Sequence, residues 1–136
     1  MITLEEIQQL VSKIAEVIDA PISKNLTFGI SRDDGTPCIQ IGQDSYYYVA
    51  RDRNTIAFQK QTRDLDELMY WVFCGVTSEM AYDYALEHPI NHVFSRRLKF
   101  SYQLKLLDRI NKDWSRKRCQ EIEEILLNYP YKDCKY

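Results

Sequence analysis

The sequence lacks most of the patterns that mark an active site. Its four glycines are scattered rather than clustered, as a phosphate-binding loop would require. No serine stands in a Gly-x-Ser-x-Gly setting, the motif of a hydrolase nucleophile. The two histidines, His88 and His92, are separated by Pro89, which interferes with the single helical face that a pair of zinc ligands needs. We therefore expect no enzyme activity, no metal site and no cofactor.

Paired cysteines and long apolar runs are also missing. The four cysteines form no Cys-x-x-Cys pair, and a chain of this size can build a core without disulfides. We expect free thiols at Cys38, Cys74, Cys119 and Cys134, with Cys74 buried. No stretch approaches the roughly 20 apolar residues that span a bilayer, and residues 1–6 show no basic region followed by an apolar one. The expected location is therefore the cytoplasm.

Length and composition fit one globular domain. The chain has 136 residues, of which 45% are hydrophobic and 28% are charged, so we expect residues 1–136 to form a single domain. The net charge of −2 argues against a dedicated nucleic-acid binder. Any binding by charge must then depend on a local patch.

The hydrophobic period of the first half changes near residue 26. Thr3 and Glu6 form a capping-box pattern, and apolar residues then recur at helical spacing until Pro21, which predicts a helix over residues 4–19. Over residues 26–61 apolar and polar residues alternate, and polar turns interrupt them at 33–35, 42–44 and 52–54. This pattern predicts an antiparallel meander of about four strands.

The second half of the chain has helical periodicity. Helices are predicted over about 64–87 and 91–111, and a last helix opens at Trp114 and ends near Tyr129. The helix over 64–87 carries a broad apolar stripe, which is typical of a helix packed on a sheet. The predicted class is α+β, with an N-terminal helix, the meander, and then about three helices packed on the sheet.

Charge is distributed unevenly along this helical half of the chain. Residues 64–87 hold six acidic residues and no basic one, for a net of −6. Residues 96–118 hold nine basic residues and two acidic ones, for a net of +7. Such a contrast can orient helices within a fold or present a charged face to a partner.

Three acids lie on one side of the helix predicted over 64–87. Glu79, Asp83 and Glu87 are spaced four residues apart. Like charges at that spacing destabilise a helix by roughly a few tenths of a kcal/mol per pair unless a cation lies nearby. That cation could belong to this chain, with Arg96 and Arg97 as candidates, or to a bound protein. The third alternative is that the three acids form a solvated face without a cation nearby. The three acids are candidate partner-binding residues.

Two polar side chains interrupt an apolar stripe on the helix predicted over 91–111. Arg96 and Gln103 share one side of it with Phe100 and Leu107. A covered Arg needs a carboxylate or carbonyl partner, because an unpaired buried charge costs several kcal/mol as an order of magnitude. We expect Arg96 and Gln103 to be structural polar residues. Arg97 points away from this side and is a candidate for contact with a partner.

The tyrosine run leaves two alternatives open. If Tyr47 packs inward, Tyr46 and Tyr48 lie together on the other face of a strand. They are then candidate partner-binding residues, because exposed tyrosines are common interface anchors. Alternatively, the first helix covers that face and buries them.

The run Arg116-Lys117-Arg118 lies near the start of the last helix, where the helix dipole disfavours cations by about 0.3 to 1 kcal/mol. Local helix stability therefore does not explain the run. It is interpreted as a solvated face, or as a contact with phosphate or an acidic protein.

Four stretches within residues 37–130 carry a family resemblance. They are Thr62-x-Asp64-Leu65-Asp66-Glu67-Leu68-x-Tyr70-Trp71-Val72-Phe73, then Met80-Ala81, then Arg96-Arg97-x-x-Phe100-x-x-Gln103-x-x-Leu106-Leu107, and lastly Trp114 with Ile125-Leu126-x-x-x-Pro130. With these stretches the chain resembles the immunity protein 63 family of bacterial polymorphic toxin systems, and the third stretch is the most specific. The resemblance assigns no role to Arg51-Asp52-Arg53.

The resemblance implies a small cytoplasmic protein that binds and neutralises a cognate toxin domain, without catalysis or a cofactor. It implies inhibition by occlusion of the toxin's active or substrate-binding site. Many such toxins are nucleases with basic grooves, where Glu79, Asp83 and Glu87 would compete with phosphates. The alternative is a nucleic-acid-binding or regulatory domain that uses the basic third and fourth helices.

Overall fold

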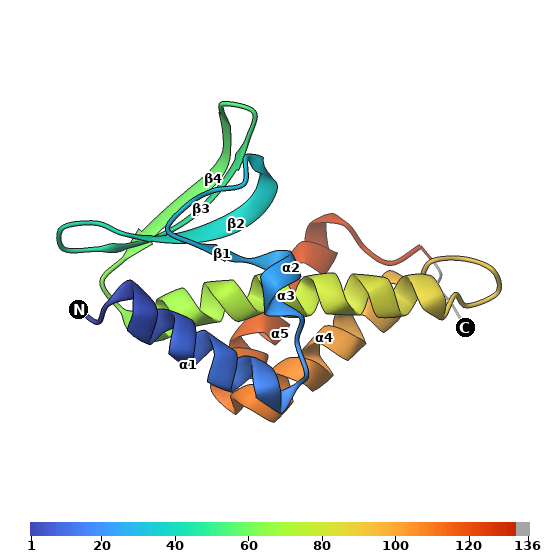
Figure 1. The fold of residues 1–136 in the computed structure, drawn as a ribbon. Helices are drawn as coiled ribbons and strands as arrows, with labels where there is room; N and C mark the ends of the chain where they lie inside the picture. Colours follow the sequence, from blue (N-terminus) through green and yellow to red (C-terminus); the bar gives the residue numbers. More distant parts are fainter. Residues whose placement is uncertain (133–136) are drawn as a thin grey trace. The chain divides into compact units, whose positions relative to one another are not determined.

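The computed structural model describes residues 1–132 and divides the chain into two compact units, Met1–Val76 (unit 1) and the residues from Thr77 onward (unit 2). An N-terminal helix and a four-stranded sheet precede the remaining helices (Figure 1), so the predicted α+β class is confirmed. That residues 1–136 form a single domain stays a prediction. Within residues 1–132, no helix combines the length and the apolar character needed to cross a membrane.

Helix α1 (Leu4–Val17) begins where the capping box predicts. The Thr3 hydroxyl accepts a hydrogen bond from the Glu6 backbone N–H at 3.1 Å, and the Glu6 carboxylate accepts one from the Thr3 backbone N–H at 2.9 Å. These two bonds satisfy donors that a helix start leaves unpaired. The helix ends two residues before the predicted boundary, and Asp19 beyond it has a positive φ of 52°.

The first strand differs from the prediction. A short helix α2 (Ile22–Asn25), which was not predicted, comes before β1 (Thr27–Phe28). Ile30 belongs to the alternating stretch over residues 26–61, but it is exposed outside the strand. Strand β1 pairs in parallel with β2 (Asp34–Ile41), so the prediction of a purely antiparallel sheet is wrong at this pair. The alternation of side chains shows which residues share a face, but it does not indicate the direction of the neighbouring strand.

The other strands form the predicted antiparallel pairs. Strand β3 (Tyr46–Asp52) lies between β2 and β4 (Thr55–Thr62), and the sheet order is β1-β2-β3-β4. Arg53 and Asn54 connect β3 to β4 with φ angles of 48° and 67°. Positive φ at both positions is the conformation of a two-residue hairpin turn whose twist matches the strands.

Tyr46 and Tyr48 belong to the core of unit 1, with exposed fractions of 2% and 5%. The Tyr46 hydroxyl accepts a hydrogen bond from the Ile2 backbone N–H at 3.1 Å. The Tyr48 ring centroid lies 5.2 Å from that of Phe58, and burial raises the pKa of its phenol far above the ordinary value. Both side chains are therefore buried rather than exposed, as a covered face predicts.

At Gly75, helix α3 (Leu65–Glu87) lies close to Tyr48 of the sheet. A Cβ atom at this position would lie 2.6 Å from the Tyr48 hydroxyl oxygen, whereas the next nearest atom, Tyr48 Cζ, would be 3.9 Å away. Atoms that close must move apart, and the hydroxyl sits on a rigid ring that is itself buried. The absence of a side chain at Gly75 therefore lets the helix pack against Tyr48.

We expect Gly75→Ala to destabilise the protein by about 1 kcal/mol, because overpacking outweighs the gain in helix propensity. In a Tyr48→Phe background the same change should instead stabilise it by up to about 1 kcal/mol, since the clashing oxygen is gone. Urea unfolding of the four proteins of this double-mutant cycle measures both values. An effect of Gly75→Ala with the same sign in both backgrounds would contradict the close approach.

Unit 2 contains the second half of α3, then α4 (Arg96–Ile110) and α5 (Lys112–Asn128). Asn111 ends one helix and starts the next. Its backbone N–H donates to the Leu107 carbonyl at 2.8 Å, and its side-chain oxygen accepts from the backbone N–H groups of Asp113 and Trp114. One residue thus satisfies backbone groups at both helix ends, which fixes the corner between α4 and α5.

Helix α4 begins five residues later than predicted. Asn91 and His92 have φ angles of 53° and 65°, and an isolated bridge joins Ile90 to Val93. Ser95 is the N-cap, and its hydroxyl accepts a hydrogen bond from the Leu98 backbone N–H at 3.1 Å. Left-handed backbone cannot continue a right-handed helix, so residues 88–94 form a loop rather than the first turn of α4.

Candidate partner-binding surface

The three predicted acids form an exposed acidic ridge, Glu79, Asp83 and Glu87, on the part of α3 that lies in unit 2. A cation of the same unit lies near its first member. Burial first, then the charges of Arg118 and Arg96, lower the pKa of Lys99, while the carboxylate of Glu79 acts in the opposite direction. Lys99, which the sequence reading did not propose, is thus an intrachain cation for the ridge.

Arg96 is half-buried and Arg97 is exposed, as the helical spacing predicts. The Arg96 guanidinium lies 5.7 Å from the Phe100 ring centroid and 5.6 Å from that of Tyr131, and its Nη1 donates to the Pro130 carbonyl at 3.4 Å. Arg97 stacks more closely, 4.1 Å from the Tyr131 ring. Stacking orients a guanidinium plane without neutralising its charge.

Gln103 is a buried polar residue with an exposed fraction of 0%. Its amide nitrogen donates to the Thr77 hydroxyl at 3.2 Å, and its amide oxygen accepts from Arg118 Nε at 3.1 Å. Arg118 also pairs with Glu121 at 3.2 Å. Buried polar groups are stable when such bonds satisfy them, so this amide connects α3, α4 and α5 within unit 2.

Sequence reasoning missed the structural role of Arg118, which it grouped with Arg116 and Lys117 as one basic run. Arg118 is largely buried and bonds to Gln103 and Glu121, whereas Arg116 is exposed and pairs with Asp113. Two bases of the run therefore already have partners within the chain. This reduces the support for a surface that contacts several phosphates through this run.

An apolar hollow of about 1000 Å³ lies in unit 2, and it was not predicted. We define it by the loop after α3, the start of α4 and the segment that ends α5. Its largest exposed apolar side chains are Ile90, Val93 and Tyr129. Tyr129, near which the last helix was predicted to end, is 70% exposed. A hollow of this size can receive several side chains of a partner.

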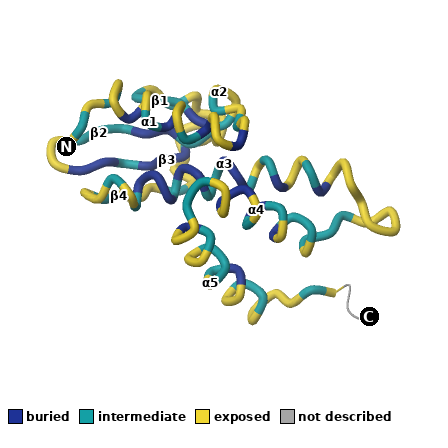
Figure 2. The backbone as a smooth tube through the Cα atoms, turned by 90° about the horizontal axis from the view of Figure 1, so that it is seen from below, coloured by how far each residue is buried: buried dark blue, intermediate teal, exposed yellow. Residues whose placement is uncertain are grey.

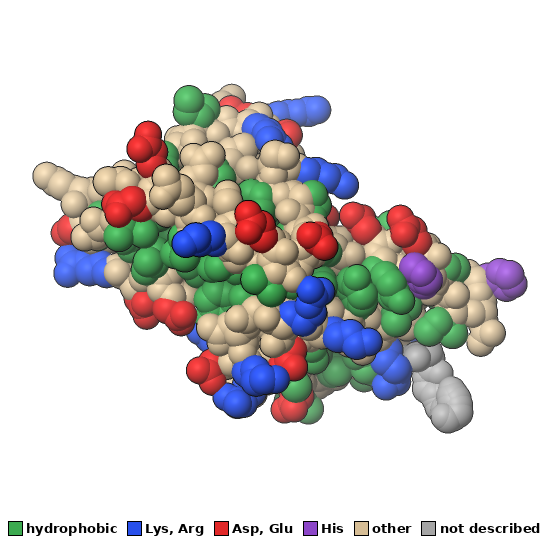
Figure 3. Space-filling model, turned by 60° about the horizontal axis from the view of Figure 1, so that its bottom comes forward, with side chains coloured by type: hydrophobic (Ala, Val, Ile, Leu, Met, Phe, Trp, Pro, Cys, Tyr) green, Lys and Arg blue, Asp and Glu red, His purple; other side chains and the backbone are tan. Residues whose placement is uncertain are grey.

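The hollow and the acidic ridge are joined by an aromatic contact. Phe94, which lines the hollow, lies 5.2 Å from the Tyr82 ring on α3, and Tyr82 stands between Glu79 and Asp83 in the sequence. Residues 86–93 are all exposed, a run of eight (Figure 2). Figure 3 shows hydrophobic side chains gathered near the two histidines, with acidic and basic side chains on their borders. Exposed apolar surface with a charged border is typical of an interaction site.

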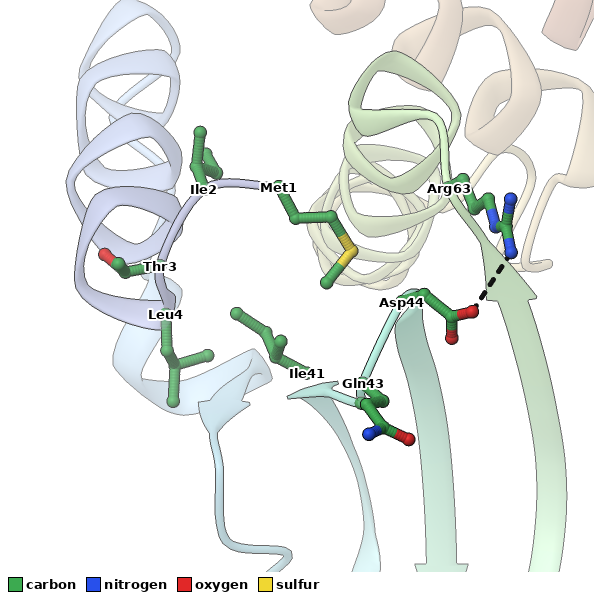
Figure 4. Close-up of a pocket in the computed structure, with 9 residues that line it drawn as sticks. Met1, Ile2, Thr3, Leu4, Ile41, Gln43, Asp44 and Arg63 are labelled. Atoms are coloured by element: carbon green, nitrogen blue, oxygen red, sulfur yellow. Dashed lines mark hydrogen bonds and ion pairs between the residues drawn. The ribbon is translucent and has the colours of Figure 1, made fainter.

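A second hollow, of about 790 Å³, lies in unit 1 beside the start of α1. Figure 4 shows Met1, Leu4 and Ile41 around it, and Arg63 pairs with Asp44 at 3.1 Å on the far side. Both ionic side chains are mostly exposed, so their pairing contributes at most about 1 kcal/mol. The arrangement contains no nucleophile with an adjacent base.

The structure describes three of the four cysteines. Cys38, Cys74 and Cys119 are not in disulfide bonds, and Cys134 lies outside the described residues. Cys74 is half-buried rather than buried, whereas Cys38 is fully buried.

The His88 ring stacks on Tyr84 at 4.1 Å, and its Nδ1 lies 2.8 Å from the Tyr84 carbonyl oxygen. Within residues 1–132 no three His, Cys, Asp or Glu side chains form a group that could hold a metal ion.

Comparison with known families gives one match. The family model described as Immunity protein 63 matches residues 43–124, which is more than half of the chain. The matched span contains the whole acidic ridge and the part of the apolar hollow that residues 90–96 line. No curated protein and no solved structure matches the chain.

Proposed function

The chain belongs to the immunity protein 63 family, and from this premise we propose that it binds and neutralises a cognate bacterial toxin domain. Neutralisation occurs by occlusion: a preformed surface of the protein covers the active or substrate-binding site of the toxin. The protein acts in the cytoplasm of the producing cell and does so without catalysis or a cofactor. The single observation that carries this proposal is the family match over residues 43–124.

The exposed side chains of unit 2 support a role in binding. The acidic ridge and the apolar hollow lie in one unit, and Tyr82 with Phe94 connects them. A protein interface commonly combines an apolar centre with a charged border. We therefore assign toxin binding to this surface, with Glu79, Asp83, Glu87 and Arg97 as the charged contacts.

The negative charge of the ridge favours a toxin whose substrate groove is basic. Nucleases have such grooves. A groove that binds phosphates attracts carboxylates for the same electrostatic reason, so the ridge would compete with nucleic acid for it. Electrostatic complementarity also speeds the encounter of two proteins. The proposed partner is thus a nuclease toxin whose substrate groove the ridge occupies.

Co-expression with the toxin encoded by the adjacent gene tests the proposal. We expect the protein to restore growth of cells that produce the toxin, and to form a stable complex with it after purification. A toxin with an inactivated catalytic residue serves as the control for binding without killing. Toxicity that persists despite abundant soluble protein, together with the absence of a complex, would refute the proposed function.

A further inference from the structure

The apolar hollow carries positive charge and no negative charge. Its described lining residues include two cations, Arg96 and Lys132, and no Asp or Glu. The rest of the lining is largely apolar, with Ile90, Val93 and Tyr129 the most exposed large side chains. A ligand that complements this lining is apolar and carries a carboxylate.

Arg96 has unused capacity to bind that carboxylate. A guanidinium has five N–H donors, and within residues 1–132 Arg96 uses one of them for the Pro130 carbonyl at 3.4 Å. No ion pair joins Arg96 to a carboxylate of the described residues, and its guanidinium lies near the Phe100 and Tyr131 rings. The guanidinium thus makes cation–π contacts with two rings. Arg96 is half-buried, which strengthens a pair with an incoming carboxylate.

We propose that the apolar hollow binds a segment of the toxin that carries a large apolar side chain next to an Asp or Glu. The apolar side chain packs among Ile90, Val93 and Tyr129, and the carboxylate pairs with Arg96. This inference rests on the proposed function, and it adds a second contact of the opposite charge to that of the acidic ridge. The ridge acts in the encounter, whereas the filled hollow retains the bound toxin.

The two contacts should affect different rate constants. Charges on an interface border change mainly the association rate, whereas a buried anchor and its charge pair change mainly the dissociation rate. We expect Val93→Asp to raise the dissociation rate of the toxin complex about 10- to 100-fold, because it places a carboxylate against the carboxylate of the toxin. Arg96→Gln should have an effect of the same order, and both variants should leave the association rate within about threefold of wild type.

Leu127→Asp is the matched control. Val93 is 62% exposed and Leu127 is 84% exposed, but Leu127 does not line the hollow. Both substitutions put an Asp in place of an exposed apolar residue, so neither disturbs the core. Biosensor measurements with the catalytically inactivated toxin give both rate constants, and the melting temperature of each variant shows whether it is folded. Arg96→Gln removes a side chain that contacts two aromatic rings, so this variant could be unstable. In that case Val93→Asp alone tests the proposal.

Overlapping peptides that cover the toxin identify the bound segment. We expect the peptides that bind wild-type protein and not Val93→Asp to contain an apolar residue beside an Asp or Glu, and to lose binding when that acid becomes its amide. If wild-type protein forms no complex with the toxin, the proposed function itself fails. If the complex forms and Val93→Asp dissociates at the wild-type rate, the hollow proposal alone is overturned. Self-association of the protein that Val93→Asp abolishes would assign the hollow to a second copy, which also overturns it.

Discussion

Reversing the acidic ridge, as Glu79→Lys, Asp83→Lys and Glu87→Lys in one variant, is expected to slow association with the toxin about 10- to 100-fold at low salt. The three acids are exposed on one side of α3, so their fields add in front of the same surface. The association rate of wild type should fall steeply as salt rises, because screening weakens this attraction. The variant should lose most of that salt dependence. Stopped-flow mixing over a salt series measures both effects.

A control variant separates a local ridge from overall charge. Glu5, Glu16 and Glu123 are also exposed acids, and replacing them with Lys changes the net charge by the same amount. This control should associate with the toxin within about threefold of wild type, since the charges lie outside the ridge. If the control and the ridge variant slow association equally, net charge rather than the ridge is responsible. Wild-type association kinetics in the ridge variant would remove the ridge from the mechanism.

Gln103→Ala is expected to lower the free energy of unfolding by about 3 kcal/mol. The substitution leaves a cavity at a position with no solvent exposure, and it removes the acceptor of Arg118 Nε and the donor to the Thr77 hydroxyl. Gln103→Leu refills much of the volume without the hydrogen bonds, so it should recover part of the loss. Urea unfolding followed by circular dichroism measures both variants.

Gln120→Ala provides the comparison for that loss. Gln120 is exposed on α5, so its replacement should change the free energy of unfolding by no more than about 0.5 kcal/mol. A loss at Gln103 as small as that at Gln120 would show that the buried amide contributes little to stability. Retained toxin affinity in folded Gln103→Ala would agree with a structural role for the amide.

Local patterns predicted the parts of the fold that depend on neighbouring residues. Thr3 and Glu6 satisfy each other's backbone donors regardless of the rest of the chain, so the start of α1 follows from a few residues. The β3–β4 turn is similar, since Arg53 and Asn54 take up a two-residue hairpin turn between adjoining strands. The start of α4 was predicted five residues too early, although Ser95 marks it locally, because serine is a favoured N-cap.

Features that depend on distant partners were not predictable from the pattern. The parallel direction of β1 follows from the path of the chain between Phe28 and Asp34, and alternation contains no information about it. Whether Tyr46 and Tyr48 were exposed depended on which segments cover their face of the sheet. The pairing of Arg118 with Gln103 requires α5 to pack on α4, which the run of basic residues did not indicate.

The candidate site was predicted in part for the same reason. Helical spacing is enough to place Glu79, Asp83 and Glu87 on one side, and to separate Arg97 from Arg96. The apolar hollow escaped prediction because it forms between segments that are about 35 residues apart in the sequence, one ending near Arg96 and the other containing Tyr129. An apolar residue that lines a hollow has the same sequence signature as one in the core.

The run of exposed residues 86–93 has an evolutionary consequence. Substitutions at exposed positions usually change folding free energy by less than about 0.5 kcal/mol, so this stretch can vary while the buried residues of α3, α4 and α5 stay the same. Asn91 and His92 are the exception, since their left-handed backbone favours Gly, Asn, Asp or His. Relatives that protect against different toxins are therefore expected to differ most in sequence at residues 86–93. Fewer substitutions are expected at Asn91 and His92.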